Sequence, residues 1–279
     1  MTEQTLQISS TLDEAFAPDL ARRQLYLLAS AAISDPVEAR VKLLFEDELQ
    51  EQTEAAIQLL SDHLPDDLEL GPGERDPSEW TSETLSDLFD VSRSSLREQY
   101  MDVFGHTISK DCPPYELEYL DRTDLFYRSR QLSDISGFYR AFGLGKSDDH
   151  HYRADHLCLQ TEYLAFLIAK RLHGQAEGHD REDLDTCLDA EETFYDDHLS
   201  WWLPSFAKAL RDTAGRDTFY GTLGTFLGGL SVLERNHFDR EPETDLHEPR
   251  VMEYDPEDQE CGSCDIPAMT AQSEKTATS

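Results

Sequence analysis

The amino-acid sequence predicts an all-α protein, which consists of a single helical-bundle domain and a disordered acidic C-terminal tail. Apolar residues recur every three to four positions along most of the chain, and no stretch shows the two-residue alternation typical of half-buried strands. The composition, 38% hydrophobic and 10% aromatic over 279 residues, is sufficient for a sizeable core. We expect a flexible N-terminus over 1–18, a helical domain over 19–238 and a tail over 239–279.

The first part of the domain contains three expected helices. They are predicted at about 19–33, 36–62 and 82–104. Asp35 is a suitable N-cap for the second of these helices, and Pro36 is tolerated in its first turn. The stretch 65–77, with two glycines and three prolines, predicts a loop that separates the first two helices from the third.

The next two helices are predicted at about 123–142 and 155–172. An apolar stripe on the first indicates a face that packs on neighbouring elements, and consists of Leu125, Leu132, Ile135, Tyr139 and Phe142. Gly143 is suited to end that helix and Gly174 to end the second. In the second helix the residues expected to point inward are Leu157, Leu164, Leu167 and Ile168.

The remaining helical pattern covers about 181–213 and 217–238. Pro204 should kink or break the first of these segments, because proline lacks the N–H that an inner helical turn requires. Three glycines in the second segment predict the close approach of another helix, namely Gly221, Gly224 and Gly228. Beyond Asp239 the chain is acidic and poor in apolar residues, which is typical of a disordered tail.

The charge of the chain excludes some partners. With 58 acidic and 24 basic residues the formal net charge is −34, which disfavours nucleic acid as a partner. A dense carboxylate shell is tolerated where salt screens it, which favours a high-salt cytoplasm, although acidity that serves a basic client is an alternative. No apolar stretch approaches the length of a membrane span and no secretory signal begins the sequence, so we expect a cytoplasmic protein without stable membrane insertion. Five cysteines at irregular spacing argue against a disulfide framework.

Three motifs could carry chemistry but match their patterns poorly. The GLGKS segment at 143–147 resembles the end of a phosphate-binding loop, yet it follows a predicted helix and lacks the earlier glycine, so we expect a helix end and a turn. Histidines and aspartates crowd into 148–156 without the spacing of a metal site on a helix. Cys261 and Cys264 have the spacing of a zinc or redox pair but no partner ligands nearby, so they are only weak metal candidates. We expect no metal and no cofactor of the chain's own.

The segment 100–122 concentrates aromatic side chains around a Pro-Pro turn. Aromatic groups with one polar end are typical of peptide-binding grooves, because they contribute contact area at a low entropy cost. Equally, they could fill the core beneath a long loop. The spacing alone does not distinguish a groove from a core.

Four ordered pieces of the chain resemble the TorD/DmsD/NarJ family of redox-enzyme maturation chaperones. They are YMDVFG at 100–105, PPYELEYLDR at 113–122, DHL at 155–157 with EYL at 162–164, and FYDDHLSWW at 194–202. The resemblance covers about 20–238 and leaves the tail outside it. It implies an all-helical chaperone, not an enzyme, that binds the twin-arginine leader or the apo catalytic subunit of a molybdopterin oxidoreductase of the dimethyl sulfoxide or nitrate reductase type. Such a chaperone assists cofactor insertion before export.

The resemblance also implies which residues bind the leader or client. These are Tyr100, Phe104, Tyr115, Tyr119, Arg122, Asp155 and His156, and Glu116 is a further acidic candidate. The aromatic groups would hold the apolar part of the leader, while Asp155 and Glu116 would pair with its arginines through forked hydrogen bonds. A metal-binding helical enzyme and a structural subunit that stays in the assembled enzyme are the alternatives. The sequence leaves open the client, a monomer or a homodimer, and nucleotide binding.

Overall fold

The fold is seen in a computed structural model, which describes residues 3–46, 48–65, 67–80, 85–105, 108–121, 124–145 and 152–251. The α-helices in these ranges are α1 (Glu3–Ile33), α2 (Leu49–Ser61), α3 (Ser86–Phe89), α4 (Arg93–Phe104), α5 (Leu125–Ala141), α6 (Leu157–Glu177), α7 (Arg181–His198), α8 (Leu203–Ala214) and α9 (Phe219–His237). Short 3-10 helices lie between them, η1 (Ala39–Phe45), η2 (Pro77–Glu79) and η3 (Glu116–Glu118). The described residues form no β-strand, which confirms the all-α prediction.

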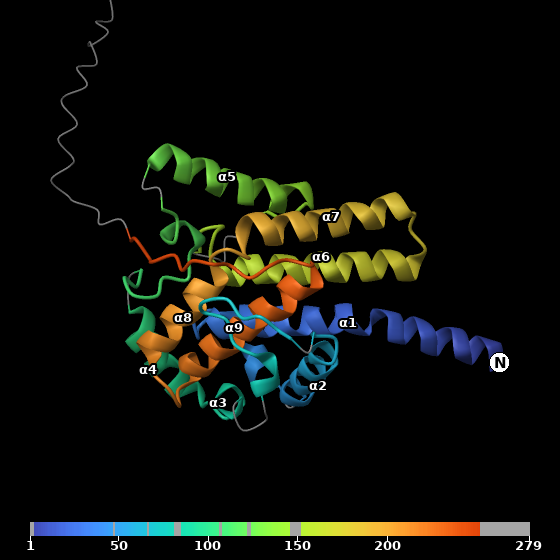
Figure 1. The fold of residues 1–279 in the computed structure, drawn as a ribbon, viewed down its shortest axis with the longest axis horizontal. Coiled ribbons are helices and arrows are strands. Elements are labelled where there is room, and N and C mark those ends of the chain that lie inside the picture. Colours follow the sequence, from blue (N-terminus) through green and yellow to red (C-terminus); the bar gives the residue numbers. More distant parts are fainter. Residues whose placement is uncertain are drawn as a thin grey trace, which may run out of the picture.

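Two groups of helices share one core. Figure 1 shows α5, α7, α6 and α1 as roughly parallel rods, and α6 contacts both α1 and α7. α8 packs along α9, and α2, α3 and α4 lie around this pair and the C-terminal half of α1. The core includes residues of α1, α6, α7, α8 and α9 that are fully buried, such as Leu25, Leu164, Phe194, Phe206 and Leu227.

The helices predicted after residue 120 are confirmed in position. α5 ends at Ala141 and Gly143 follows it with φ of 75°, as expected of a helix-terminating glycine. The 181–213 segment breaks between α7 and α8, and Pro204 lies in the first turn of α8, where its missing N–H costs no hydrogen bond. The inward positions predicted for α6 are all buried.

The glycines of α9 allow the close packing that the sequence predicts. A Cβ atom on Gly224 would lie 2.8 Å from the carbonyl oxygen of Ala207 in α8, and one on Gly221 would lie 1.9 Å from that of Gly215. At Gly224 the backbones of α8 and α9 therefore approach more closely than a side chain would permit. Gly221 instead faces Gly215, just after α8, and Gly228 faces the Arg211 side chain and the carbonyl of Gly73 in a loop.

Other predicted helix limits are wrong. The helix expected at 36–62 is split into η1 and α2, because Glu46 is extended and lets α2 turn against α1. The one expected at 82–104 is split into α3 and α4, with Ser92 capping α4 through the backbone N–H of Ser95. α6 passes Gly174 and ends at Glu177, before Gly178 with φ of 75°.

Two further differences concern the ends of helices. α1 begins at Glu3, well before the helix expected from residue 19, while the predicted domain limits stay predictions. Leu125 is 68% exposed, so it does not join the buried stripe of α5. It is the first residue of that helix.

A buried ion network ties the helices together. The guanidinium of Arg22 in α1 lies 2.6 Å from Glu191 of α7 and 2.5 Å from Glu234 of α9, and Tyr26 donates a hydrogen bond to Glu234. All four side chains are almost fully buried. Separating these helices would leave an uncompensated charge in the core, which is costly. The network therefore constrains the relative positions of α1, α7 and α9.

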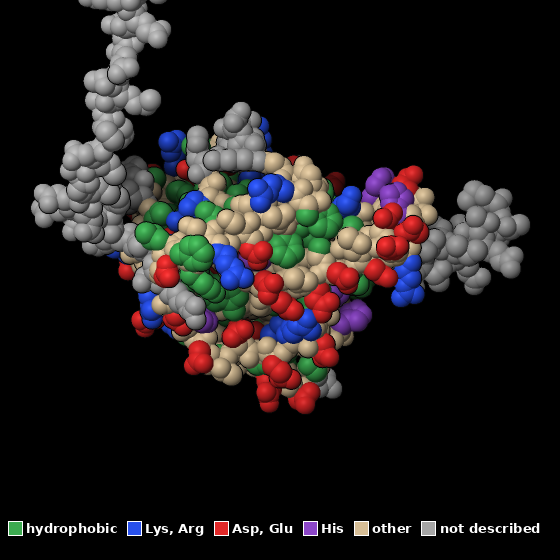
Figure 2. All heavy atoms as spheres, turned by 90° about the horizontal axis from the view of Figure 1, so that it is seen from above, with side chains coloured by type: hydrophobic (Ala, Val, Ile, Leu, Met, Phe, Trp, Pro, Cys, Tyr) green, Lys and Arg blue, Asp and Glu red, His purple; other side chains and the backbone are tan. Residues whose placement is uncertain are grey.

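The surface carries the excess of negative charge. Figure 2 shows acidic side chains gathered over the lower and right parts of one face, with basic and apolar side chains among them. Among the described residues, no helix combines the length and the hydropathy that crossing a membrane requires.

Candidate functional site

Two segments with predicted site residues lie side by side. Tyr115 and His156 form an isolated antiparallel bridge, in which the backbone N–H of Glu116 donates to Asp155 and that of Leu157 donates to Pro114. Both bonds are 3.0 Å long. This bridge places η3 against the start of α6 and brings Tyr115, Glu116, Asp155 and His156 together.

The carboxylate of Asp155 is fully buried and is already paired. It accepts hydrogen bonds from Arg153 at 2.7 and 2.9 Å and from the backbone N–H of Leu117 at 3.2 Å. Arg153 also reaches Glu118, at 2.9 Å, and its guanidinium lies 4.5 Å from the centre of the Tyr115 ring. Asp155 therefore fixes the position of Arg153 and of η3.

His156 caps α6 and is held between two tyrosines. Its Nδ1 accepts the backbone N–H of Cys158 at 3.1 Å, so the ring carries its proton on Nε2. The ring stacks on Tyr152 at 4.1 Å between ring centres and meets Tyr115 edge-on at 4.8 Å. Burial, with Arg40 and Arg153 nearby, lowers the pKa of His156 to about 3, so the ring is neutral at physiological pH.

Glu116 lies beneath this bridge in a polar network. Its carboxylate accepts hydrogen bonds from Gln131 at 2.9 Å and from Gln160, and lies 3.2 Å from Nδ1 of His198. Burial raises the pKa of Glu116 above its usual value, an effect that His198 and Gln131 partly oppose. The network joins η3 to α5, α6 and α7.

The predicted aromatic residues divide between core and surface. Phe104 is 5% exposed and packs against Tyr220, and Tyr119 is fully buried against Trp202. Tyr100 and Tyr115 are only half-buried. The core alternative therefore applies to Phe104 and Tyr119, and a binding role for Tyr100 and Tyr115 stays a prediction. Arg122 lies outside the described residues.

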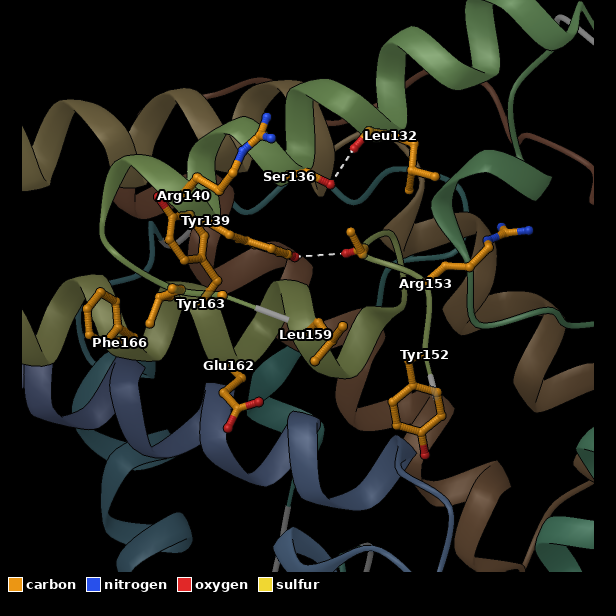
Figure 3. Close-up of a pocket in the computed structure, with 13 residues that line it drawn as sticks. Leu132, Ser136, Tyr139, Arg140, Tyr152, Arg153, Leu159, Glu162, Tyr163 and Phe166 are labelled. Atoms are coloured by element: carbon orange, nitrogen blue, oxygen red, sulfur yellow. Dashed lines mark hydrogen bonds between the residues drawn. The ribbon is translucent and has the colours of Figure 1, made fainter. Parts of the chain in front are cut away.

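A cavity of about 740 Å³ opens between α5 and α6, next to the bridge. We call it the α5–α6 cavity, and Figure 3 shows the side chains that line it. Its lining consists of Leu132, Ser136, Tyr139 and Arg140 of α5, Leu144 and Gly145 after it, Tyr152, Arg153 and Ala154 before α6, and Leu159, Glu162, Tyr163 and Phe166 of α6. Most of these groups are apolar or aromatic. Tyr139 donates a hydrogen bond of 2.9 Å to the carbonyl of Ala154, which joins the two walls.

Among the described residues, three charged side chains belong to the lining of the cavity. Arg140 is exposed at the end of α5, and Arg153 is held by Asp155 and Glu118. Glu162 is 50% exposed and forms an ion pair with Arg40. An apolar interior with charged edges suits an extended segment that is apolar and carries charge at its ends.

The cavity is not predicted from the sequence, although its pattern is visible in the chain. Residues 132, 136, 139 and 140 form one face of α5, and 159, 162, 163 and 166 form one face of α6. The predicted packed stripe of α5 includes Leu132 and Tyr139, and they do contact the core. The periodicity of apolar residues is the same whether a helix face packs against another helix or lines a cavity, so it does not distinguish the two.

No group of three or more metal-binding side chains occurs in the part of the chain that the structure describes. The crowded segment 148–151, Cys261 and Cys264 lie outside that part. Cys112, Cys158 and Cys187 are buried free thiols, and burial raises the pKa of each.

A known protein family and two characterised proteins resemble this chain. The family model of the nitrate reductase delta subunit matches residues 46–208. The selenate reductase assembly chaperone protein of Thauera selenatis is 30% identical over 164 residues, which are 58% of this chain and 80% of that protein. The chlorate reductase assembly chaperone protein of Ideonella dechloratans is 30% identical over 112 residues, 40% of this chain and 55% of that protein. Both relatives are assembly chaperones rather than catalytic enzymes.

Proposed function

Because this chain belongs to the nitrate reductase delta subunit family, we propose that it is a maturation chaperone for the catalytic subunit of a molybdopterin oxidoreductase. It binds the precursor of that subunit in the cytoplasm, through the twin-arginine leader, the apo subunit or both. It holds the precursor until the cofactor is inserted and catalyses no reaction itself. The relatives are named for selenate and chlorate reductases, and we infer a client of the related dimethyl sulfoxide or nitrate reductase type.

The observation that carries the proposal is the α5–α6 cavity. It lies within the part of the chain that the family model matches, and its interior offers leucine, tyrosine and phenylalanine side chains to an apolar segment. Glu162 on the rim supplies a carboxylate for a client arginine, which would take the place of Arg40 in a forked pair.

The residues implied by the family resemblance have two roles in this proposal. Tyr100 and Tyr115 are half-buried and offer surface to the client. Asp155 and His156 hold the cavity wall in place through Arg153 and Tyr152. The buried Glu116, Phe104 and Tyr119 support that wall, and the contact of Arg122 with the client stays a prediction.

The charge of −34 bears on how a client is recognised. At about 1 M salt the screening length is only about 3 Å, so long-range attraction of a basic leader is nearly absent. We infer that recognition in a high-salt cytoplasm depends on direct, partly buried contacts such as those that the cavity provides.

Capture from cells that naturally make the chain tests this function. The tagged chain is purified rapidly at the salt concentration of the cytoplasm, and the bound proteins are identified by mass spectrometry. We expect the precursor of a molybdopterin enzyme with its leader intact and without cofactor. Capture of only the mature, assembled enzyme would instead support a structural subunit, and a stoichiometric transition metal without any client would support a metal-dependent enzyme.

A further inference from the structure

The chain after α9 is fastened across the surface in an extended form. We call residues 239–251 the strap, and Figure 1 shows it in red, running from the end of α9 back across the molecule. Arg240 forms ion pairs with Asp196 and Glu192 of α7. Further along, the backbone N–H of His247 donates to the hydroxyl of Ser205 at 2.9 Å.

The strap ends beside the α5–α6 cavity. The backbone N–H of Arg250 donates to the carbonyl of Glu118 at 2.6 Å, and its guanidinium donates to the carbonyl of Asp121. The carboxylate of the same Glu118 binds Arg153, which lines the cavity. The last described residues of the chain are therefore bonded to Glu118, which in turn holds Arg153 of the cavity lining.

The sequence of residues 252–279 complements this rim. It contains seven carboxylates and one lysine, and its single run of consecutive apolar residues is Ile266-Pro-Ala-Met269, directly after Asp265. At roughly 3.3 Å per extended residue, the fifteen steps from Val251 to Ile266 span up to about 50 Å.

The charge of the rim selects an acidic segment over a neutral one. Arg140 is exposed there and has no carboxylate partner among the described residues, whereas Glu162, the acidic residue of the lining, is paired with Arg40. The guanidinium of Arg140 is therefore available to pair with Asp265 at the entrance.

We propose that residues 252–279 fold back on their own chain and place Ile266 to Met269 in the α5–α6 cavity, with Asp265 beside Arg140. The segment is an intramolecular occupant that a client has to displace. That a client displaces the segment rests on the proposed function, whereas the occupancy of the cavity does not. An effective concentration of about 1 mM for a tethered segment allows a weak contact to cover an apolar cavity while a tighter client replaces it.

Disulfide trapping in the purified full-length chain, without any client, tests the occupancy. One variant carries Ser136→Cys at the cavity, and its control carries Ser133→Cys on the same helix. Both serines donate to a backbone carbonyl of α5 at 2.8 Å, but Ser136 lines the cavity, whereas Ser133 is exposed and is not part of the lining. Cys261→Ser in both leaves Cys264 as the one thiol of residues 252–279, and the native cysteines in the described ranges are buried.

Under a mild thiol oxidant we expect the Ser136→Cys chain to form an intramolecular link to Cys264 about tenfold faster than the control, or more. Adding Ile266→Asp and Met269→Asp should reduce the rate to that of the control. Equal rates for the two serine positions, or a link that forms only between chains, would overturn the proposal. Neither result would bear on client capture, so a failure of the occupancy is distinguishable from a failure of the proposed function.

Discussion

His156 joins the capping of α6 to the aromatic wall of the site, and its neutral ring is required for both contacts. In the unfolded chain its pKa is near 6.5, whereas in the folded chain it is lowered to about 3. The unfolded state thus binds more protons between these values, so the stabilisation is complete above pH 6.5 and is lost as the pH falls towards 3.

The variant His156→Asn tests this coupling. Asparagine keeps an acceptor at the N-cap but does not titrate, so the variant should lose less stability on acidification. One unit below the unfolded pKa, at about pH 5.5, the difference should reach about 1.4 kcal/mol relative to about pH 7. Denaturant unfolding of both proteins at the two pH values measures it. Parallel losses would show that His156 also becomes protonated in the folded state.

Asp155 illustrates how burial changes the expected result of a substitution. Asp155→Ala removes the partner of Arg153 and of the Leu117 N–H, and should lower the free energy of unfolding by about 1.5–3 kcal/mol, as for hydrogen bonds to a charged group. Asp189→Ala, at an exposed site on α7, should change it by less than about 0.5 kcal/mol. Denaturant titration compares them, and an unchanged stability for Asp155→Ala would contradict the positioning role assigned to that carboxylate.

The spacing of α8 and α9 makes a prediction at the scale of helices. Gly224→Ala would place a methyl group 2.8 Å from Ala207 O and 3.0 Å from Arg211 N, atoms of a neighbouring backbone that cannot turn aside. We expect a loss of about 1–3 kcal/mol, as for other overpacked cores.

Gly137→Ala in α5 is the matched control, since no atom of the described residues lies within 4 Å of the position that its methyl group would occupy. It should raise stability by up to about 1 kcal/mol through helix propensity. Thermal unfolding distinguishes the two changes by sign. A Gly224→Ala protein as stable as the parent would mean that the helices separate without cost.

How far the sequence predicts the elements depends on whether a signal is local. Gly143 and Pro204 determine a helix end and a helix break through their own backbone geometry, and the sequence predicts both. The break before α2 follows from how α2 packs on α1, and the pairing of Arg22 with Glu191 and Glu234 joins residues far apart in the chain. Periodicity shows which face of a helix is apolar, but neither the partner of that face nor the α5–α6 cavity.

At the scale of the whole molecule, the net charge of −34 predicts a stability that rises with salt. Screening reduces the repulsion among surface carboxylates, and the screening length falls from about 10 Å at 0.1 M to about 3 Å at 1 M. We expect the melting temperature to rise steeply over this range of sodium chloride and to level off above it. A flat curve below about 1 M would contradict a surface adapted to high salt.

Client binding in the α5–α6 cavity is the central claim. Its most direct test is the affinity of the full-length chain, at native salt, for a synthetic leader peptide of the captured precursor, comparing Ser136→Arg with Ser133→Arg. The two variants add the same side chain and charge to α5, and lose the same kind of intrahelical hydrogen bond, but only Ser136 is part of the cavity lining. We expect Ser136→Arg to weaken binding by about tenfold or more and Ser133→Arg to leave it unchanged. Equal affinities, in two proteins of equal melting temperature, would contradict the claim.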